Sequence, residues 1–154
     1  GTPVGGFITN DDIASSYTRP GASTFGGNPV TSVAALATLE VIEKYNLTQN
    51  AETMGKSLKD RLRLLQDKHS IIGDVRGKGL MVGAELVGNN KVPAQKEIDI
   101  ILEYMKDRGV LLGKTGAGRN VLTFQPPLII TDEDIKEVID VLDSALTHVE
   151  KQNE

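Results

Sequence analysis

The chain has 154 residues, a hydrophobic fraction of 39% and a net charge of −4 from 17 basic and 21 acidic side chains. This is enough apolar sequence for the core of one domain, or of one domain with an appended piece, and it excludes a disordered chain. The interspersed charges exclude nucleic acid and anionic membranes as partners, no segment reaches the roughly 20 apolar residues of a membrane span, and the absence of cysteine excludes disulfides and thiolate metal sites.

The first 49 residues are predicted to hold one strand, one loop and one long helix. Residues 4–9 are short, apolar and compatible with a strand, and Asn10 can cap a brief helical turn that continues to Tyr17. Residues 18–28 are rich in Gly, Ser, Thr and Pro and form a loop. Asn28 suits an N-cap and Pro29 suits the first helical position, so a helix is predicted from Pro29 to about Tyr45.

The start of this long helix is a candidate anion site. Free backbone N–H groups and the positive end of the helix dipole attract negative charge, and the hydroxyls of Ser23 and Thr24 add further donors. Gly26 and Gly27 allow the backbone to approach a helix or a ligand closely. The structural alternative is a glycine-rich loop that simply leads into a capped helix, and the spacing matches no nucleotide P-loop.

The middle of the chain alternates between helical and extended patterns. A second helix is predicted after the interruption at residues 46–50 and extends to about Lys68, with one apolar face formed by Met54, Leu58, Leu62 and Leu65. Residues 71–87 are predicted to be extended around a glycine-flanked turn. A third helix is expected over about residues 93–108, and Gly109 is expected to stop it in the left-handed conformation.

The last third predicts two strands and a helix. Residues 110–112 and 121–124 are expected to be short strands joined by the turn at 116–118, and the final helix is expected to begin at Thr131 or Asp132. The order of elements after residue 50 predicts an α+β domain in which helices cover a small, mostly antiparallel sheet. His69 and His148 fall at predicted helix ends, where we expect each to be solvated and to interact with the helix dipole.

Four segments together resemble a known family. They are GTPVGGF at the start of the chain, STFGGNP at 23–29, DVRGKGLMVGAEL at 74–86 and NVLTFQPPL at 120–128. In this order they resemble the class III pyridoxal-phosphate aminotransferases of fold type I, over essentially the whole chain. The resemblance implies that residues 1–49 are the C-terminal piece of the large cofactor-binding domain with the interdomain helix, and that residues 50–154 are the small C-terminal domain.

The resemblance also implies a reaction, a cofactor and a partner. Members of this family move an amino group between an amino donor and a 2-oxo acid on pyridoxal 5'-phosphate, as homodimers with shared active sites. The absence of cysteine fits a cytoplasmic protein, which is the compartment we expect. The segment that contains Thr24 reaches across the dimer, and its threonine, here assisted by Ser23, binds the cofactor phosphate of the neighbouring subunit. The resemblance implies no metal.

The catalytic lysine of the family has no counterpart in this chain. The family's Schiff-base lysine lies a few residues before a segment that resembles Gly1-Thr2-Pro3, so we expect it upstream of this chain. The chain is then a C-terminal fragment, which we expect to be inactive alone. Residues 1–49 have no sheet to join within the chain, and we expect them to be swapped, dimerised or loosely packed when the upstream part is absent.

Arg76 and Thr123 are the candidate substrate residues. The guanidinium of Arg76 suits a carboxylate or a phosphate, and it suits a structural cluster equally well. Many family members that act on α-amino acids have an arginine at the position of Thr123, so its replacement disfavours an ornithine, acetylornithine or dialkylglycine enzyme. Threonine at this position leaves room for an ω-amine or alanine-like donor with glyoxylate or pyruvate as partner, or for a substrate whose carboxylate is held elsewhere. The structural alternative is that Thr123 is a residue that favours strands.

Two alternative functions stay open at this point. The first is a non-catalytic α+β interaction module that uses its helices for protein contacts. The second is a mutase or decarboxylase built on the same scaffold. The sequence does not identify the donor or the acceptor.

Overall fold

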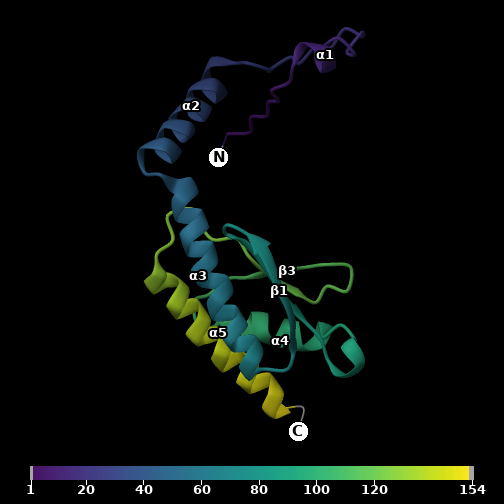
Figure 1. The fold of residues 1–154 in the computed structure, drawn as a ribbon, viewed down its shortest axis with the longest axis vertical. Helices are drawn as coiled ribbons and strands as arrows, with labels where there is room; N and C mark the ends of the chain where they lie inside the picture. Colours follow the sequence, from purple (N-terminus) through teal and green to yellow (C-terminus); the bar gives the residue numbers. More distant parts are fainter. Residues whose placement is uncertain (1, 153–154) are drawn as a thin grey trace. The chain divides into compact units, whose positions relative to one another are not determined.

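The computed structural model describes residues 2–152. Their secondary structure comprises α1 (Asp11–Ala14), α2 (Pro29–Lys44), α3 (Leu47–Lys68), β1 (Ile72–Lys78), β2 (Met81–Leu86), the 3-10 helix η1 (Asn89–Lys91), α4 (Gln95–Lys106), β3 (Gly113–Thr115), β4 (Val121–Phe124) and α5 (Asp132–Gln152), as Figure 1 shows. The chain divides between Asn46 and Leu47 into two compact units. The assignment of residues 1–49 to a large domain and of 50–154 to a small domain stays a prediction.

The first unit contains α1, a long loop and α2. Asn10 caps α1 as expected, because its side-chain oxygen accepts a hydrogen bond from the N–H of Ile13 at 2.9 Å. The predicted strand at residues 4–9 is wrong, since these residues are irregular. The physical reason is that a strand needs a neighbour for its backbone hydrogen bonds, and no second strand occurs among the described residues of this unit.

Helix α2 begins and ends close to the predicted residues. Asn28 accepts a hydrogen bond from the N–H of Thr31 at 3.1 Å, and Pro29 occupies the first helical position. No residue between 2 and 46 is buried, and Val30, Val33, Leu36 and Leu39 of α2 are all exposed. Helices with apolar residues on several sides are normally packed against other parts of a protein on those sides.

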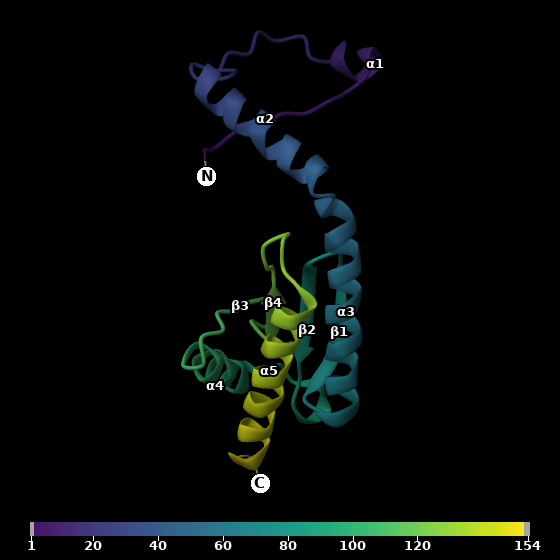
Figure 2. The same cartoon turned by 90° about the vertical axis from the view of Figure 1, so that its left-hand side faces the viewer.

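The second unit is an α+β domain, as predicted. Its sheet has four antiparallel strands in the order β1-β2-β4-β3. Helix α3 packs on β1 and β2, and α5 packs on both α3 and α4. Figure 2 shows α3 and α5 running side by side along the sheet. All three helices contribute to one core, which leaves the opposite face of the sheet uncovered.

The strands place alternate side chains in this core. Val82, Ala84 and Leu86 of β2 are buried as the alternating pattern predicts, and Leu122 and Phe124 of β4 join them. The helical core residues are Leu58, Leu62, Leu65, Ile98, Ile101, Met105, Ile135, Ile139, Leu142, Ala145, Leu146 and Val149.

A glycine allows α3 to lie directly against the turn between β1 and β2. A Cβ atom on Gly55 would lie 2.0 Å from the carbonyl oxygen of Gly79, which is far closer than two such atoms can approach. Gly79 itself has a φ of 52°, in the left-handed region that glycine tolerates best. This contact fixes the β1–β2 hairpin on α3.

Two boundaries differ from the sequence prediction. Helix α3 begins at Leu47, within the expected interruption, because the buried Leu47 anchors its first turn. Gly109, which follows the end of α4, has a φ of 82° and so adopts the left-handed conformation as predicted. Residues 110–112, however, form no strand. The N–H of Val110 bonds to Met105 at the end of α4, and pairing with β4 starts only at Gly113.

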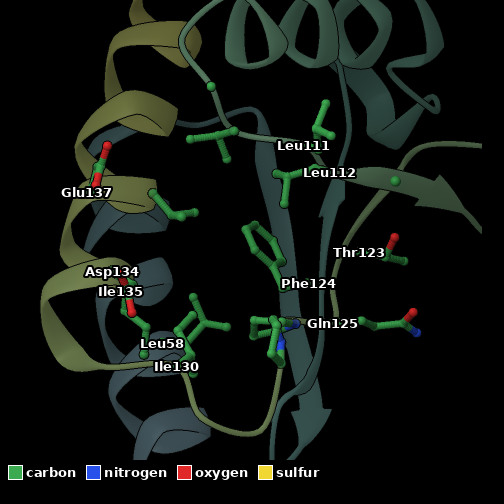
Figure 3. Close-up of a pocket in the computed structure, with 16 residues that line it drawn as sticks. Leu58, Leu111, Leu112, Thr123, Phe124, Gln125, Ile130, Asp134, Ile135 and Glu137 are labelled. Carbon is green, nitrogen blue, oxygen red and sulfur yellow. The ribbon is translucent and has the colours of Figure 1, made fainter. Parts of the chain in front are cut away.

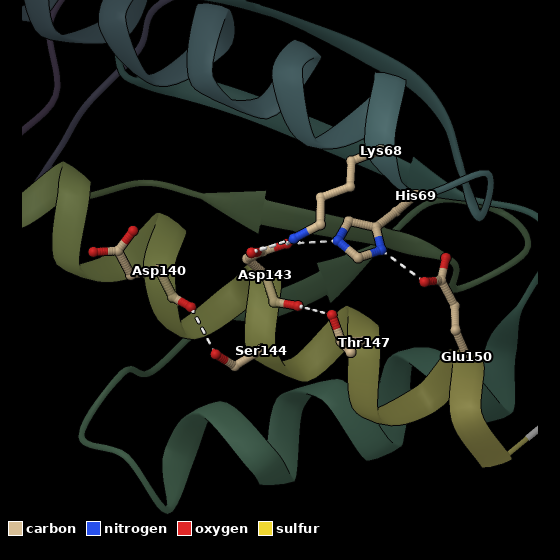
Figure 4. A network of polar contacts seen from close by, with 7 residues as sticks. All are labelled: Lys68, His69, Asp140, Asp143, Ser144, Thr147 and Glu150. Atoms are coloured by element: carbon tan, nitrogen blue, oxygen red, sulfur yellow. Dashed lines mark hydrogen bonds and ion pairs between the residues drawn. The ribbon is translucent and has the colours of Figure 1, made fainter.

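The prediction of a solvated histidine is wrong for His69. Its side chain is only 2% exposed and lies between two carboxylates of α5: Nδ1 is 2.7 Å from Glu150 Oε2, and Nε2 is 2.6 Å from Asp143 Oδ1 (Figure 4). Lys68 bonds to the same Asp143 at 2.6 Å. Hydrogen bonds from His69 and then from Lys68 lower the pKa of Asp143. The cluster joins the end of α3 to α5, whereas His148 is exposed as predicted.

Candidate functional site

The loop before α2 presents two hydroxyls beside a helix start. Ser23 and Thr24 lie in a turn that closes where the N–H of Gly26 bonds to the carbonyl of Ser23 at 3.3 Å. A Cβ atom on Gly26 would lie 2.9 Å from the Cβ of Ser23, and Gly27 has a φ of 69°. Both glycines are therefore required by the shape of this turn. Within residues 2–152, neither hydroxyl has a hydrogen-bond partner.

The chemistry of this loop fits a phosphate group. Its donors are hydroxyls and backbone N–H groups at the positive end of a 16-residue helix. The first turn of α2 carries no acidic residue, and no Asp or Glu occurs between Asp12 and Glu40. No carboxylate of this segment therefore competes with a bound anion. Ser23 and Thr24 belong to the first unit of the chain, whereas Arg76 and Thr123 belong to the second.

The sheet brings Arg76 and Thr123 into one row on its uncovered face. Arg76 of β1 pairs with Gly83 of β2, which pairs with Thr123 of β4, which in turn pairs with Gly113 of β3. Residues paired in this way point to the same face of a sheet. Gly83 has no side chain, so nothing stands between Arg76 and Thr123 in this row.

The guanidinium of Arg76 is already bound by two carboxylates. Its Nη1 donates to Asp74 Oδ2 at 2.6 Å and to Glu85 Oε2 at 2.7 Å. These hydrogen bonds, first that to Asp74 and then that to Glu85, raise the pKa of Arg76. A substrate carboxylate would have to displace them. The geometry therefore supports the structural alternative for Arg76, which joins β1 to β2 through Glu85.

A cavity of about 540 Å³ lies on the other side of β4, and sequence reasoning missed it. It is bounded by the first half of α5, residues 109–113 and the end of β4. Figure 3 shows Phe124 pointing toward α5, whereas Thr123 and Gln125 point away from it. The only sequence signal was Pro126-Pro127, which line the cavity where the chain leaves the sheet. Its walls are mostly apolar, and Asp134 and Glu137 supply carboxylates.

The described part of the chain has no group of three or more His, Asp or Glu side chains that could hold a metal ion. Among residues 2–152, no helix is both long enough and apolar enough to cross a bilayer.

Comparison with known proteins links this geometry to a family. The family model for class III aminotransferases matches residues 1–146. The alanine–glyoxylate aminotransferase 2 homolog 2, mitochondrial, of Arabidopsis thaliana is 45% identical over 96% of this chain and 31% of its own length. The acetylornithine aminotransferase of Caldanaerobacter subterraneus subsp. tengcongensis is 36% identical over 97% of this chain and 36% of its own.

Solved structures give the same result. An aminotransferase from Bacillus anthracis superposes with a TM-score of 0.79 at 36% identity, covering 90% of this chain and 34% of that one. A phospholyase from Arthrobacter in complex with phosphoethanolamine superposes with a TM-score of 0.81 at 32% identity, covering 89% of this chain and 32% of that one. The chain thus spans about a third of the length of these relatives.

Proposed function

The chain belongs to the class III aminotransferase family, and we propose that it forms part of a pyridoxal-phosphate-dependent enzyme that moves an amino group from an amino donor to a 2-oxo acid. One observation carries this proposal. A chain of this family holds both a loop with two hydroxyls and no acidic residue, before α2, and a sheet face that no helix covers. The first suits a cofactor phosphate and the second suits a substrate.

Pyridoxal phosphate, when bound, supplies an electron sink for the carbon that carries the amino group. In this proposal Ser23 and Thr24 hold its phosphate through their hydroxyls and through N–H groups at the start of α2. The phosphate belongs to the cofactor of the other subunit of a homodimer. The absence of buried residues from 2 to 46 supports this arrangement, because such a segment needs a surface on which to pack.

Thr123 and the names of relatives guide the proposed substrates. Thr123 is uncharged and cannot form the paired hydrogen bonds by which an arginine grips a carboxylate. The relatives include an alanine–glyoxylate aminotransferase and a taurine–pyruvate aminotransferase from Bilophila wadsworthia. We propose alanine or an ω-amine as the donor, and glyoxylate or pyruvate as the acceptor. The cytoplasm stays the predicted compartment.

The test uses a full-length class III subunit that carries this chain, loaded with pyridoxal phosphate. We expect it to form pyruvate and glycine from L-alanine and glyoxylate. The mass of the products separates transfer from the alternatives, since a decarboxylase releases carbon dioxide and a mutase gives an isomer of its substrate. Binding of the cofactor without transfer from any amine to any 2-oxo acid would contradict the proposal.

Replacing Thr123 by arginine should shift the preference of this enzyme toward donors with a carboxylate at that end. Gly83 and Gly113, its neighbours in the row, leave room for the longer side chain. Hydrogen bonds to charged groups contribute about 1.5–3 kcal/mol, so we expect the ratio of kcat/KM for ornithine over ethylamine to rise about 10- to 100-fold. Thr123→Gln is the uncharged control, and an equal rise in that variant would contradict the prediction.

The isolated 154-residue chain should show little amide protection in residues 4–30. These residues are exposed or at most half-buried, and only short turns and the start of α2 use their N–H groups. Hydrogen exchange followed by mass spectrometry should instead find strong protection around the buried Leu62 and Ile101. Strong, uniform protection of residues 4–30 in a proven monomer would contradict the prediction.

A further inference from the structure

The proposed function makes no use of the cavity beside β4. Three of its lining residues, Leu58, Phe124 and Ile135, are almost fully buried, whereas Leu111, which also lines it, is 81% exposed. The cavity therefore extends from the core of the second unit to its surface. Protein interiors are closely packed, so an apolar hollow of about 540 Å³ that reaches the surface indicates a place that another group fills.

The charges at the cavity are all negative. Its lining residues include two carboxylates, Asp134 and Glu137, and no Lys, Arg or His. Asp134 accepts hydrogen bonds from the backbone N–H and the hydroxyl of Thr131, at 2.9 and 2.8 Å. Glu137, on α5 in Figure 3, forms no ion pair within residues 2–152. The cavity thus combines apolar walls with one carboxylate that lacks a cation in the described part of the chain.

Glu137 belongs to a row of three carboxylates on α5. Glu133 lies four residues before it and Asp140 three residues after it, so the three side chains share one side of the helix. We call these three residues the acidic strip. All three are exposed, and like charges at this spacing destabilise a helix. The helix dipole accounts for Glu133, in the first turn, but its effect does not extend to Glu137 and Asp140.

The first unit of the chain is a poor match for this surface. Its cations within residues 2–46 are Arg19 and Lys44, and its carboxylates are Asp11, Asp12, Glu40 and Glu43. This unit is negative as a whole, so the acidic strip disfavours its docking. The same holds for the first unit of a second copy of the chain. The curated relatives, in contrast, are about three times as long as this chain, which leaves most of a full-length subunit as a source of the occupant.

We propose that the cavity and the acidic strip receive a segment of the full-length subunit that lies outside this chain. A large apolar side chain of that segment fills the cavity, and a lysine or arginine beside it pairs with Glu137. The apolar contact excludes water, which strengthens the ion pair next to it. This inference rests on the proposed function in one respect, namely that the chain forms part of a longer enzyme subunit.

The test is the labelling of single cysteines, because the 154-residue chain contains none of its own. Val138→Cys places a thiol in the wall of the cavity. Lys136→Cys is the matched control, since Lys136 is exposed on the same helix and does not line the cavity. The rate of alkylation by N-ethylmaleimide is read by mass spectrometry on the labelled peptide. We expect labelling of Val138→Cys to be at least tenfold slower in the full-length holoenzyme than in the 154-residue chain, and that of Lys136→Cys to differ less than twofold.

A charge reversal tests the cation. In full-length Leu111→Cys, the further change Glu137→Lys should speed labelling at least threefold, because the new charge repels the lysine or arginine of the segment. Glu137→Gln should have a smaller effect in the same direction. The same pairs of substitutions in the 154-residue chain correct for any direct effect of the charge on the thiol, and they should change its rate less than twofold.

Four outcomes overturn the inference. Equal labelling of Val138→Cys and of Leu111→Cys in both proteins means that no segment fills the cavity. Equal protection of Lys136→Cys means that α5 is shielded as a whole. Protection that grows with the concentration of the 154-residue chain assigns the surface to a second copy. Protection that Glu137→Lys leaves unchanged removes the cation. The proposed function fails separately, since it is judged by the transfer of amino groups, which none of these measurements uses.

Discussion

Replacing Thr24 by valine is expected to weaken the binding of pyridoxal phosphate to the full-length enzyme about 10- to 100-fold. The change keeps the shape of the side chain and removes one hydroxyl donor. A hydrogen bond to a charged acceptor contributes about 1.5–3 kcal/mol, which corresponds to this range of affinity. No residue of the loop after Arg19 is cationic, so this loop can hold the phosphate only through neutral donors, of which the hydroxyl of Thr24 is one.

The measurement is a titration of the cofactor-free enzyme with pyridoxal phosphate. Thr24→Ser retains the hydroxyl and should recover most of the affinity. Thr38→Val is the matched control within α2, because that hydroxyl donates only to the carbonyl of Ala34, at 2.8 Å. Affinity within twofold of the wild type for Thr24→Val would remove Thr24 from the phosphate site.

Replacing His69 by alanine is expected to destabilise the second unit by about 2–4 kcal/mol. The ring is buried, and both of its nitrogens face carboxylate oxygens, which can only accept hydrogen bonds in their ionised form. Removal of the ring leaves a cavity. It also deprives Asp143 and Glu150 of the hydrogen-bonding group that lies between them. Leaving a buried polar group without its hydrogen-bond partner costs about 1–3 kcal/mol, the cavity adds to this cost, and the partial exposure of both carboxylates limits it.

Urea unfolding of the 154-residue chain measures this loss. His148→Ala is the matched control on the same helix, since His148 is exposed, and it should change the free energy of unfolding by less than about 0.5–1 kcal/mol. Equal effects of the two substitutions would show that the His69 cluster contributes nothing.

The same cluster predicts a pH dependence. The pKa of Asp143 lies below its ordinary value of 3.8, chiefly because of the hydrogen bond to His69, so the folded chain binds fewer protons there than the unfolded chain. The resulting stability is present above the unfolded pKa and is lost as the pH falls through the lower, folded pKa. In His69→Ala this acid-range loss should shrink, because Lys68 remains as the only strong partner of Asp143.

Local signals in the sequence were enough to predict the helices and strand β2, in which buried and exposed residues alternate. The cap at Asn28, the proline after it and the run of apolar residues in α5 act within a few residues of one another, so the sequence shows them directly. The strand at 113–115 was missed because its position depends on pairing with β4 and not on its own residues, which are Gly, Lys and Thr. The burial of His69 was missed because its partners lie on a helix far along the chain.

For the candidate site, too, some features could be predicted from the sequence and others could not. Thr24 was predicted as an anion donor from its place before a helix, whereas its role toward a cofactor and the importance of Thr123 came from the resemblance to a family. These roles stay proposals. The sequence could not predict how the residues on the sheet are arranged. Only the register of the strands shows that Arg76, Gly83 and Thr123 form one row. The ion pairs that occupy Arg76 depend on the hairpin that brings Glu85 back beside it. No pattern in the linear sequence distinguishes a free guanidinium from an occupied one.

Among residues 2–152, all the buried ones lie from Leu47 onward, which has a practical consequence for calorimetry. Heat absorbed on melting and the accompanying heat-capacity change follow the amount of apolar surface that becomes hydrated. We therefore expect a thermogram of the 154-residue polypeptide to report on Leu47 and the residues after it. Substitutions at Ser23 and Thr24, in the loop proposed to hold the phosphate, should leave its midpoint unaltered.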